Sequence, residues 1–379
     1  MRVLFAPDSF KGSLTSVAVA SALADGWARG RADDARVLAP LADGGEGTLD
    51  AIEAAGGWTR RQARVVDPIR RELDGTWLER PLNGAQDGRM ESVVELAVAS
   101  GLSRLTHHER DPFGATTVGT GQLLLAAIDA GATSITLGIG GSATNDGGHG
   151  ILEALGARIR EDDPGPAIDL DGLDRRLAGV DLRVACDVDN PLLGPRGAAA
   201  TYGPQKGASP ADVVAIDARL GWWATALETA TGRHERDTPG AGAAGGVGFA
   251  LLCLQDRFRT FGLRPGVELV MAATGFEGAL ADADLVITGE GRIDAQTAFG
   301  KTAMGVATRA RAARVPCIAV GGGCTPEGIE VLTALGVVVV PVSEEPQSVE
   351  AAMAAGSEPL VRCGERVARL IGIGLELAG

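Results

Sequence analysis

Lysine is rare in this chain, and every lysine adjoins a glycine. Only three of its 35 Lys and Arg residues are lysines: Lys11, Lys206 and Lys301. Because arginine is the default cation here, the positions that keep lysine are candidates for sites that need a compact point charge. A lysine beside a glycine-lined loop is a recurrent way to hold a phosphoryl group during its transfer. The three lysines therefore predict phosphate sites, with ordinary surface turns as the alternative.

The segment PDSFKGS, residues 7–13, brings Asp8, Ser9 and Lys11 together where an apolar strand is predicted to end. Serine hydroxyls, backbone N–H groups and the N-terminus of the next helix all favour an anion at such a turn. We expect Lys11 to act in catalysis and Asp8 and Ser9 to bind substrate. A plain helix-capping turn is the alternative.

The segment LADGGEGT, residues 41–48, carries Asp43 and Glu46 on either side of two glycines. Two carboxylates just past a strand could hold Mg²⁺ or orient a hydroxyl group. The alternative is a turn followed by acidic residues in a first helical turn, which the helix dipole also favours.

Residues 288–305, TGEGRIDAQTAFGKTAMG, concentrate ionisable groups between a predicted strand and a predicted helix. The end of this segment resembles a P-loop, but Ala295 stands where that motif requires glycine, so it is not a Walker A motif. A structural role does not easily account for so many charges at one strand end. We expect the following residues to form part of the site: Glu290 as a metal ligand, Arg292 as a substrate ligand, Asp294 and Lys301 in catalysis, and Thr302 on phosphate.

The segment GIGGSATNDGG, residues 138–148, allows two interpretations. Its small and polar residues could form a nest of backbone N–H groups for phosphate. Alternatively, Gly138, Gly140 and Ala143 match the dinucleotide fingerprint, with Glu161 about 20 residues further on, and would indicate an NAD-dependent hydroxy-acid dehydrogenase. The residues predicted to bind nucleotide phosphates are Gly140, Gly141, Ser142, Asn145 and Asp146.

A fifth segment, residues 185–209, ends a predicted strand with Asp189 and Asn190 and places Lys206 in the following loop. We expect Asp189 to act as a base, Asn190 to bind substrate or metal, and Lys206 to bind phosphate. A turn initiated by the Asp-Asn-Pro sequence is the alternative.

These segments recur in one pattern: an apolar run, a turn rich in Gly, Asp and Ser, and then a helical segment rich in Ala and Leu. Such a pattern predicts an α/β fold with doubly wound parallel sheets, whose ligands bind outside the carboxyl ends of the strands. Helices are expected over about 14–29, 46–55, 146–156, 300–313 and 326–334. Residues 57–97 alternate more and predict hairpin structure, with turns at Asp74-Gly75 and Asp87-Gly88.

Composition excludes several classes of partner. A net charge of −14 and a pI near 4.8 argue against nucleic acid and anionic membranes. The longest apolar runs have the length of strands and are too short to span a bilayer. Five scattered cysteines form no zinc or disulfide pattern, so a reduced, cytoplasmic protein is expected.

Taken together, the motifs resemble the type I glycerate kinase family. The matching blocks occur in that family's order over residues 1 to about 325: APDSFKGSL, LADGGEGT, DPFGATTVGTGQLL, GIGGSATNDGG, ACDVDNPLLGPRGA, YGPQKGA, the glycine run at 239–248 and TGEGRIDAQTAFGKT. The resemblance implies phosphorylation of D-glycerate to 2-phosphoglycerate, with ATP and Mg²⁺. It also implies two Rossmann-like domains, residues 1–80 with 281–379 and an insert of 81–280, with the active site in the cleft between them.

For such a kinase, the residues suggest a division of roles. Lys11, Lys301 and the 142–148 loop would hold the phosphates of ATP, and Arg292 would bind the carboxylate of glycerate. Asp189, or secondly Asp294, would act as the base. The candidate ligands of Mg²⁺ are Asp8, Asp43, Glu46 and Glu290. A non-catalytic sugar-acid sensor is a further alternative. No adenine-reading motif is recognisable, so the sequence does not indicate which domain binds adenine. The sequence also does not set the oligomeric state.

Overall fold

The chain forms two units, each with its own sheet and core. Unit 1 contains residues 1–43, 50–56 and 267–379, and unit 2 contains residues 44–49 and 57–266. The computed structural model describes residues 1–82, 87–162, 165–298, 302–345 and 347–378. Unit 2 starts earlier than the boundary expected near 80 because the hairpin after residue 57 pairs with the strands of unit 2.

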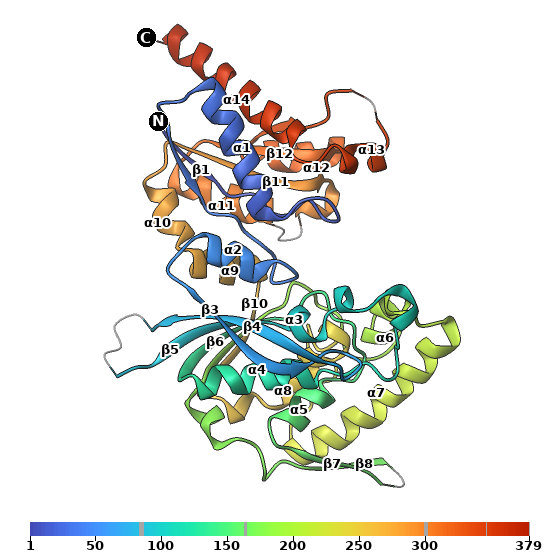
Figure 1. Cartoon of the computed structure of the whole chain (residues 1–379). Coiled ribbons are helices and arrows are strands. Elements are labelled where there is room, and N and C mark those ends of the chain that lie inside the picture. The colour runs from blue at the N-terminus through green and yellow to red at the C-terminus, as the bar shows by residue number, and fades with distance from the viewer. Residues whose placement is uncertain (83–86, 163–164, 299–301, 346, 379) are drawn as a thin grey trace. The chain divides into compact units, whose positions relative to one another are not determined.

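The sheet of unit 1 consists of five parallel strands in the order β13-β12-β11-β1-β2. Figure 1 labels β1, β11 and β12 of this sheet. Its central strands are apolar and almost fully buried, as expected for a sheet covered on both faces. From β1 the chain passes to β2 on one side and to β11 on the other, so the order reverses between β1 and β11. The strands are β1 (Arg2–Phe5), β2 (Ala35–Leu38), β11 (Leu285–Ile293), β12 (Cys317–Cys324) and β13 (Val338–Pro341).

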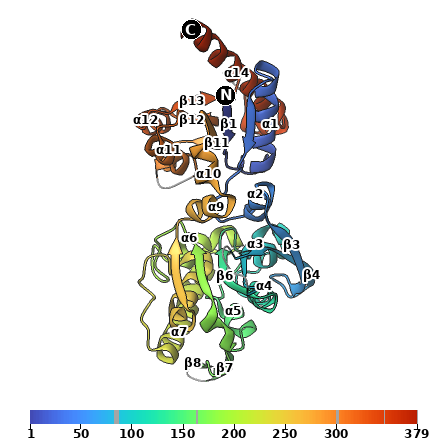
Figure 2. The same cartoon turned by 90° about the vertical axis from the view of Figure 1, so that its left-hand side faces the viewer.

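Helices cover both faces of this sheet. Figure 2 shows α1 and α14 on one side and α11 and α12 on the other. The helices that lie wholly or mainly in unit 1 are α1 (Ser16–Gly30), α2 (Thr48–Ala54), α9 (Gly266–Thr274), α10 (Phe276–Ala281), α11 (Thr302–Ala313), α12 (Pro326–Thr333), α13 (Val349–Ala354) and α14 (Glu358–Ala378).

Glycines set the close approach of α1 and α14. A Cβ atom added to Gly364 would lie 2.4 Å from the carbonyl oxygen of Leu23, and one added to Gly26 would lie 2.0 Å from that of Val361. No real Cβ sits so close to backbone, so a larger residue at either position would force the two helices apart.

We expect Gly364→Ala to lower the free energy of unfolding by about 2 kcal/mol, because the added methyl group overpacks the helix contact. Gly374→Ala, in the same helix, is the matched control, since a Cβ there meets nothing within 4 Å. The control should gain up to about 1 kcal/mol from helix propensity. Urea unfolding of both variants measures the difference, and equal stabilities would contradict the packing argument.

The main sheet of unit 2 has six strands in the order β10-β9-β6-β5-β4-β3. The pairs from β5 to β10 are parallel, while β3 and β4 form an antiparallel hairpin at the edge. A separate two-stranded sheet joins β7 and β8. The strands are β3 (Thr59–Val66), β4 (Glu72–Pro81), β5 (Met90–Glu95), β6 (Ala132–Gly138), β7 (Arg158–Asp162), β8 (Gly165–Asp169), β9 (Asp181–Ala185) and β10 (Thr260–Arg264).

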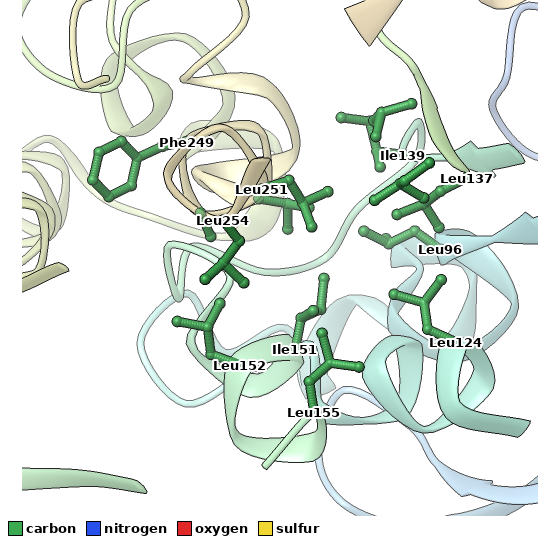
Figure 3. Packing of buried hydrophobic residues seen from close by; sticks show 14 of the residues in the cluster. Leu96, Leu124, Leu137, Ile139, Ile151, Leu152, Leu155, Phe249, Leu251 and Leu254 are labelled. Carbon is green, nitrogen blue, oxygen red and sulfur yellow. The ribbon is translucent and has the colours of Figure 1, made fainter. Parts of the chain in front are cut away.

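The core of unit 2 is built mainly from aliphatic side chains of the sheet and its helices, together with aromatic side chains such as Phe249 (Figure 3). Leu96, Leu137 and Ile151, from three different elements, are fully buried in it. The helices are α3 (Leu96–Ser100), α4 (Val118–Asp129), α5 (His149–Ala154), α6 (Ala198–Tyr202), α7 (Pro210–Thr231) and α8 (Val247–Cys253).

The expected α/β class is confirmed, but one turn is wrong. Asp74 and Gly75 lie inside β4, where they pair with Arg64 and Ala63 of β3. The hairpin turns instead at residues 67–71.

In the part of the chain that the structure describes, no helix is both long enough and apolar enough to cross a membrane.

Candidate functional site

A cavity of about 590 Å³ opens at the carboxyl ends of β1 and β11 in unit 1. This is where the strand order reverses, the position at which open α/β sheets bind their ligands. The strand order corresponds to the 2-1-3-4-5 arrangement of flavodoxin-like sheets, whose switch point lies between the first and third strands. Six of the residues that the sequence assigned to a site line this one cavity: Asp8, Ser9, Lys11, Asp43, Glu290 and Arg292.

Asp8 follows β1 and is anchored from two sides. Its carboxylate accepts a hydrogen bond of 2.5 Å from the Thr302 hydroxyl, at the start of α11, and one of 2.6 Å from the backbone N–H of Ser9. Burial raises the pKa of Asp8, and the nearby Asp43 carboxylate raises it further, against the lowering by these hydrogen bonds and by Lys11. The carboxylates of Asp8 and Asp43 thus concentrate negative charge beside the cavity, and the ionised form of Asp8 lowers the stability of the folded protein.

Lys11 is an exposed cation of this cavity. Its side chain is 87% exposed, and its Nζ lies 3.8 Å from a carboxylate oxygen of Asp43. A contact this long and exposed contributes little to stability. Lys11 can therefore turn toward an anionic ligand without loss of a strong internal interaction.

Glu290 and Arg292 project from the end of β11. Glu290 is 6% exposed and accepts a hydrogen bond of 2.5 Å from the Thr297 hydroxyl. Arg292 is 71% exposed, and its Nε lies 3.2 Å from a carboxylate oxygen of Asp294. The arginine fork is accessible to a carboxylate or phosphate, whereas Glu290 is fixed in position.

Glycines line the base of the cavity. A Cβ on Gly291 would lie 3.2 Å from the Cα of Phe10, and one on Gly322 would lie 2.6 Å from the carbonyl oxygen of Gly291. Backbone therefore packs directly on backbone here, and a side chain at either position would push the 10–14 turn and β12 away from β11.

Lys206 of unit 2 lies in the interior. It is 2% exposed, and its Nζ donates to the Ser142 hydroxyl at 3.0 Å and to the Thr144 carbonyl oxygen at 2.6 Å. The amine therefore holds the loop after β6, whereas the sequence predicts that it contacts phosphate. Burial lowers the pKa of Lys206 to about 7, and the nearby Asp146 only partly opposes this.

This depressed pKa gives a pH test. Between pH 7 and 10.5 the unfolded chain binds more protons at Lys206 than the folded chain, so this residue makes the protein more stable as pH rises. We expect the wild type to gain about 2 kcal/mol over Lys206→Met between roughly pH 7 and 9. Urea titrations at several pH values measure this gain. A difference that does not change with pH would contradict the burial of the amine.

Other polar groups of the 142–148 loop are used within unit 2. The Asp146 carboxylate accepts hydrogen bonds from Thr117 N and Oγ1, Gly148 N and Gly150 N, so it caps the start of α5. Asn145 donates through Nδ2 to the carbonyl oxygen of Pro112. These contacts make the loop rigid and give Asp146 a structural role, although the sequence predicts that it binds phosphate.

The glycines of the dinucleotide fingerprint also have a packing role. A Cβ on Gly138 would lie 2.5 Å from the carbonyl oxygen of Gly44, and one on Gly140 would lie 2.6 Å from the Cα of Gly45. Another segment of unit 2 thus occupies the space that a pyrophosphate would need. Moreover, Glu161 lies on β7, outside the six-stranded sheet. The basis for an NAD-dependent dehydrogenase is therefore absent. Gly141, with φ of +73°, forms the turn that follows.

Asp189 and Asn190 lie in the loop after β9. Asp189 is 77% exposed and forms an ion pair of 3.3 Å with Arg196. Asn190 donates through Nδ2 to the carbonyl oxygen of Arg196, and its Oδ1 accepts from the Tyr202 hydroxyl. The amide thus organises its own loop, and Asp189 is accessible. Glu46, also in unit 2, is exposed.

The carboxylates of unit 1 fit a cation with an incomplete protein ligand set. Among the described residues, no three His, Cys, Asp or Glu side chains are grouped as a metal site. Mg²⁺ commonly takes only one or two carboxylates, with water and substrate phosphates as its other ligands. The pKa of Asp8 is raised partly by Asp43, and a cation between the two would relieve that repulsion. Lys301 lies outside the described residues.

The sequence missed the apolar wall of the cavity. Phe10 and Leu14 contribute to it, as do residues that follow β13. None of the latter belongs to a recognisable motif, and amphipathic character was the only signal they offered. They line the cavity in the following order along the chain: Val342, Val349, Met353 and Leu360.

Comparisons with known proteins agree with the motifs. The model of the family described as "Glycerate kinase family" matches residues 3–372. The Glycerate 2-kinase of Escherichia coli K12 is 38% identical over 402 residues, covering 100% of both chains. The Glycerate kinase of Halalkalibacterium halodurans is 43% identical over 332 residues, which cover 84% of this chain and 85% of that protein. The crystal structure of a Salmonella typhimurium LT2 protein assigned as glycerate kinase 2 is similar over 99% of both chains, with a TM-score of 0.82 and 38% identity.

Proposed function

The chain belongs to the glycerate kinase family, and we propose that it transfers the γ-phosphoryl group of ATP to the 2-hydroxyl of D-glycerate, forming 2-phosphoglycerate and ADP. One observation carries this proposal beyond the family: a single cavity at the switch point of unit 1 is lined by both cations and carboxylates. Phosphoryl transfer depends on positioning and charge neutralisation, and this set of residues is suited to both.

On this proposal the cationic side chains of the site bind different anionic groups of the two substrates. Lys11 binds phosphate oxygens, because a point charge on a flexible stem follows the γ-phosphoryl group as it moves. Arg292 binds the carboxylate of glycerate, because its planar fork matches a carboxylate bidentately. Lys301 and Thr302 are proposed to bind phosphate oxygens together with Lys11. Ser9 is proposed to donate hydrogen bonds to the substrate from its backbone N–H and its hydroxyl group.

The carboxylates have two tasks. Asp8, with Asp43 and Glu290, would hold Mg²⁺, which supplies charge neutralisation to the phosphates when bound. Asp294 would accept the proton of the 2-hydroxyl group of D-glycerate. The hydroxyl oxygen attacks the γ-phosphorus of ATP, and the bond between that phosphorus and the oxygen that leaves with ADP breaks. We favour it over Asp189 because it adjoins Arg292, which positions the substrate.

A steady-state assay of ADP release tests the proposed reaction. ADP should form only when D-glycerate, ATP and Mg²⁺ are all present, and EDTA should abolish its formation. Binding of D-glycerate without any ADP release would contradict the kinase and favour the non-catalytic sensor. Tight binding of NADH, followed by its fluorescence, would instead favour the dehydrogenase.

A further inference from the structure

The unit 1 cavity is much larger than a three-carbon acid requires. Its volume of about 590 Å³ lies within the range of about 300–1,000 Å³ that is typical of pockets for ligands the size of a nucleotide or a drug. D-Glycerate with its polar contacts would occupy only a small part of this space. The cavity therefore has room for a second and larger ligand beside the acid.

The two ends of the cavity differ in chemistry. The charged residues follow β1 and β11, the strands at the switch point, whereas Val342 follows β13, the edge strand of the same sheet. Adjacent strands are about 4.8 Å apart, so two strand spacings place the β13 end roughly 10 Å from the β11 carboxylates. A ligand that lies across the strand ends would thus meet charge at one end and apolar surface at the other.

The apolar end combines packed side chains with accessible ones from α13, where Val349 is 68% and Met353 is 39% exposed. Phe10 is 9% exposed, Val342 is 7% exposed and Leu360 is 1% exposed. Met353 of α13 closes the wall over the 10–14 turn, since a Cβ on Gly12 would lie 2.9 Å from its Cε. Flat, largely apolar heterocycles bind to surfaces of this kind, whereas a triphosphate does not.

We propose that this apolar end binds the adenine and ribose of the nucleotide, so that unit 1 carries the adenine. The triphosphate then extends along the glycine-lined strand ends toward Lys11 and Asp8. This inference rests on the proposed function, because it identifies the position of the phosphoryl donor. It also assigns a role to the segment after β13, in which no motif was recognised.

Two substitutions on α13 test the proposal. Met353→Asp places a charge in the apolar wall, and Ala352→Trp fills the cavity. No residue of α13 is buried, so both variants should fold. Val214→Asp is the control, because Val214 is 71% exposed and lies on α7 of unit 2.

The readout is direct binding of ADP and of adenosine by calorimetry in magnesium-free buffer, together with the KM for each substrate. We expect both α13 variants to bind ADP and adenosine at least tenfold more weakly than the wild type and the control, with the KM for D-glycerate unchanged within twofold. Unchanged ADP affinity in an active enzyme would overturn the adenine site but leave the kinase intact. A rise only in the KM for D-glycerate would assign the apolar end to the acid instead. A wild type that releases no ADP would refute the proposed function itself, and unchanged adenosine binding in the variants would still refute the site.

Discussion

Asp8→Asn is expected to lower kcat/KM by about 10²–10³-fold while making the folded protein more stable. The activity falls because Asn keeps the shape of the side chain and removes the negative charge proposed to hold Mg²⁺ near the transferred phosphoryl group. The stability rises because burial and Asp43 both raise the pKa of Asp8, which means that its ionised form is unfavourable in the fold. Steady-state kinetics and urea unfolding measure the two effects.

A fall in activity together with a rise in stability would distinguish a functional role of Asp8 from a structural one. A residue that only supported the fold would lose activity and stability together. Asp282→Asn is the matched control, since Asp282 is 65% exposed and its ion pair with Arg2 of the same unit is long, at 3.8 Å. It should change neither quantity. An Asp8→Asn enzyme with normal turnover would remove Asp8 from the site.

Lys301→Met is expected to lower kcat by roughly 10³-fold, and Lys301→Arg should recover little of it. The first expectation follows from the loss of a cation on the phosphates in the transition state. The second follows from composition, because a chain that otherwise uses arginine keeps only three lysines. A wide guanidinium fork is not equivalent to a compact ammonium group as a ligand of a phosphoryl group.

Single-turnover kinetics with ATP and D-glycerate provide the measurement, with Arg311→Met in α11 as the control for loss of a cation elsewhere in unit 1. Arg311 interacts only with the carbonyl oxygen of Ala334 among the hydrogen bonds that the structure gives it. Full activity in Lys301→Met would exclude this lysine from the reaction. Full activity in Lys301→Arg would refute the argument from lysine rarity.

The strand ends of unit 1 could be predicted because their signal is local. Buried parallel strands appear as apolar runs, and the residues that follow them must lie at one edge of the sheet. This rule alone assigns Asp8, Asp43 and Glu290 to one region, and all three line the unit 1 cavity. The hydrogen bond between Thr302 and Asp8 was not predictable in the same way, since 294 positions separate them along the chain.

Unit 2 shows where local signals fail. Lys206 and Asp146 occur in glycine-rich loops typical of phosphate sites, yet tertiary packing buries the lysine and uses the aspartate as a cap. The Asp74-Gly75 pair favours a turn, but pairing with β3 keeps it in a strand, and the hairpin turns where Asp67 accepts hydrogen bonds from Ile69 and Arg71. In each case the deciding interaction is distant in sequence or cross-strand.

The most direct test of the proposed reaction is phosphorus NMR of the purified protein incubated with D-glycerate, ATP and Mg²⁺. We expect a 2-phosphoglycerate signal that grows together with ADP. A 3-phosphoglycerate signal would keep the kinase and contradict attack by the 2-hydroxyl group. The absence of any new phosphoester, with D-glycerate bound, would contradict the proposed reaction.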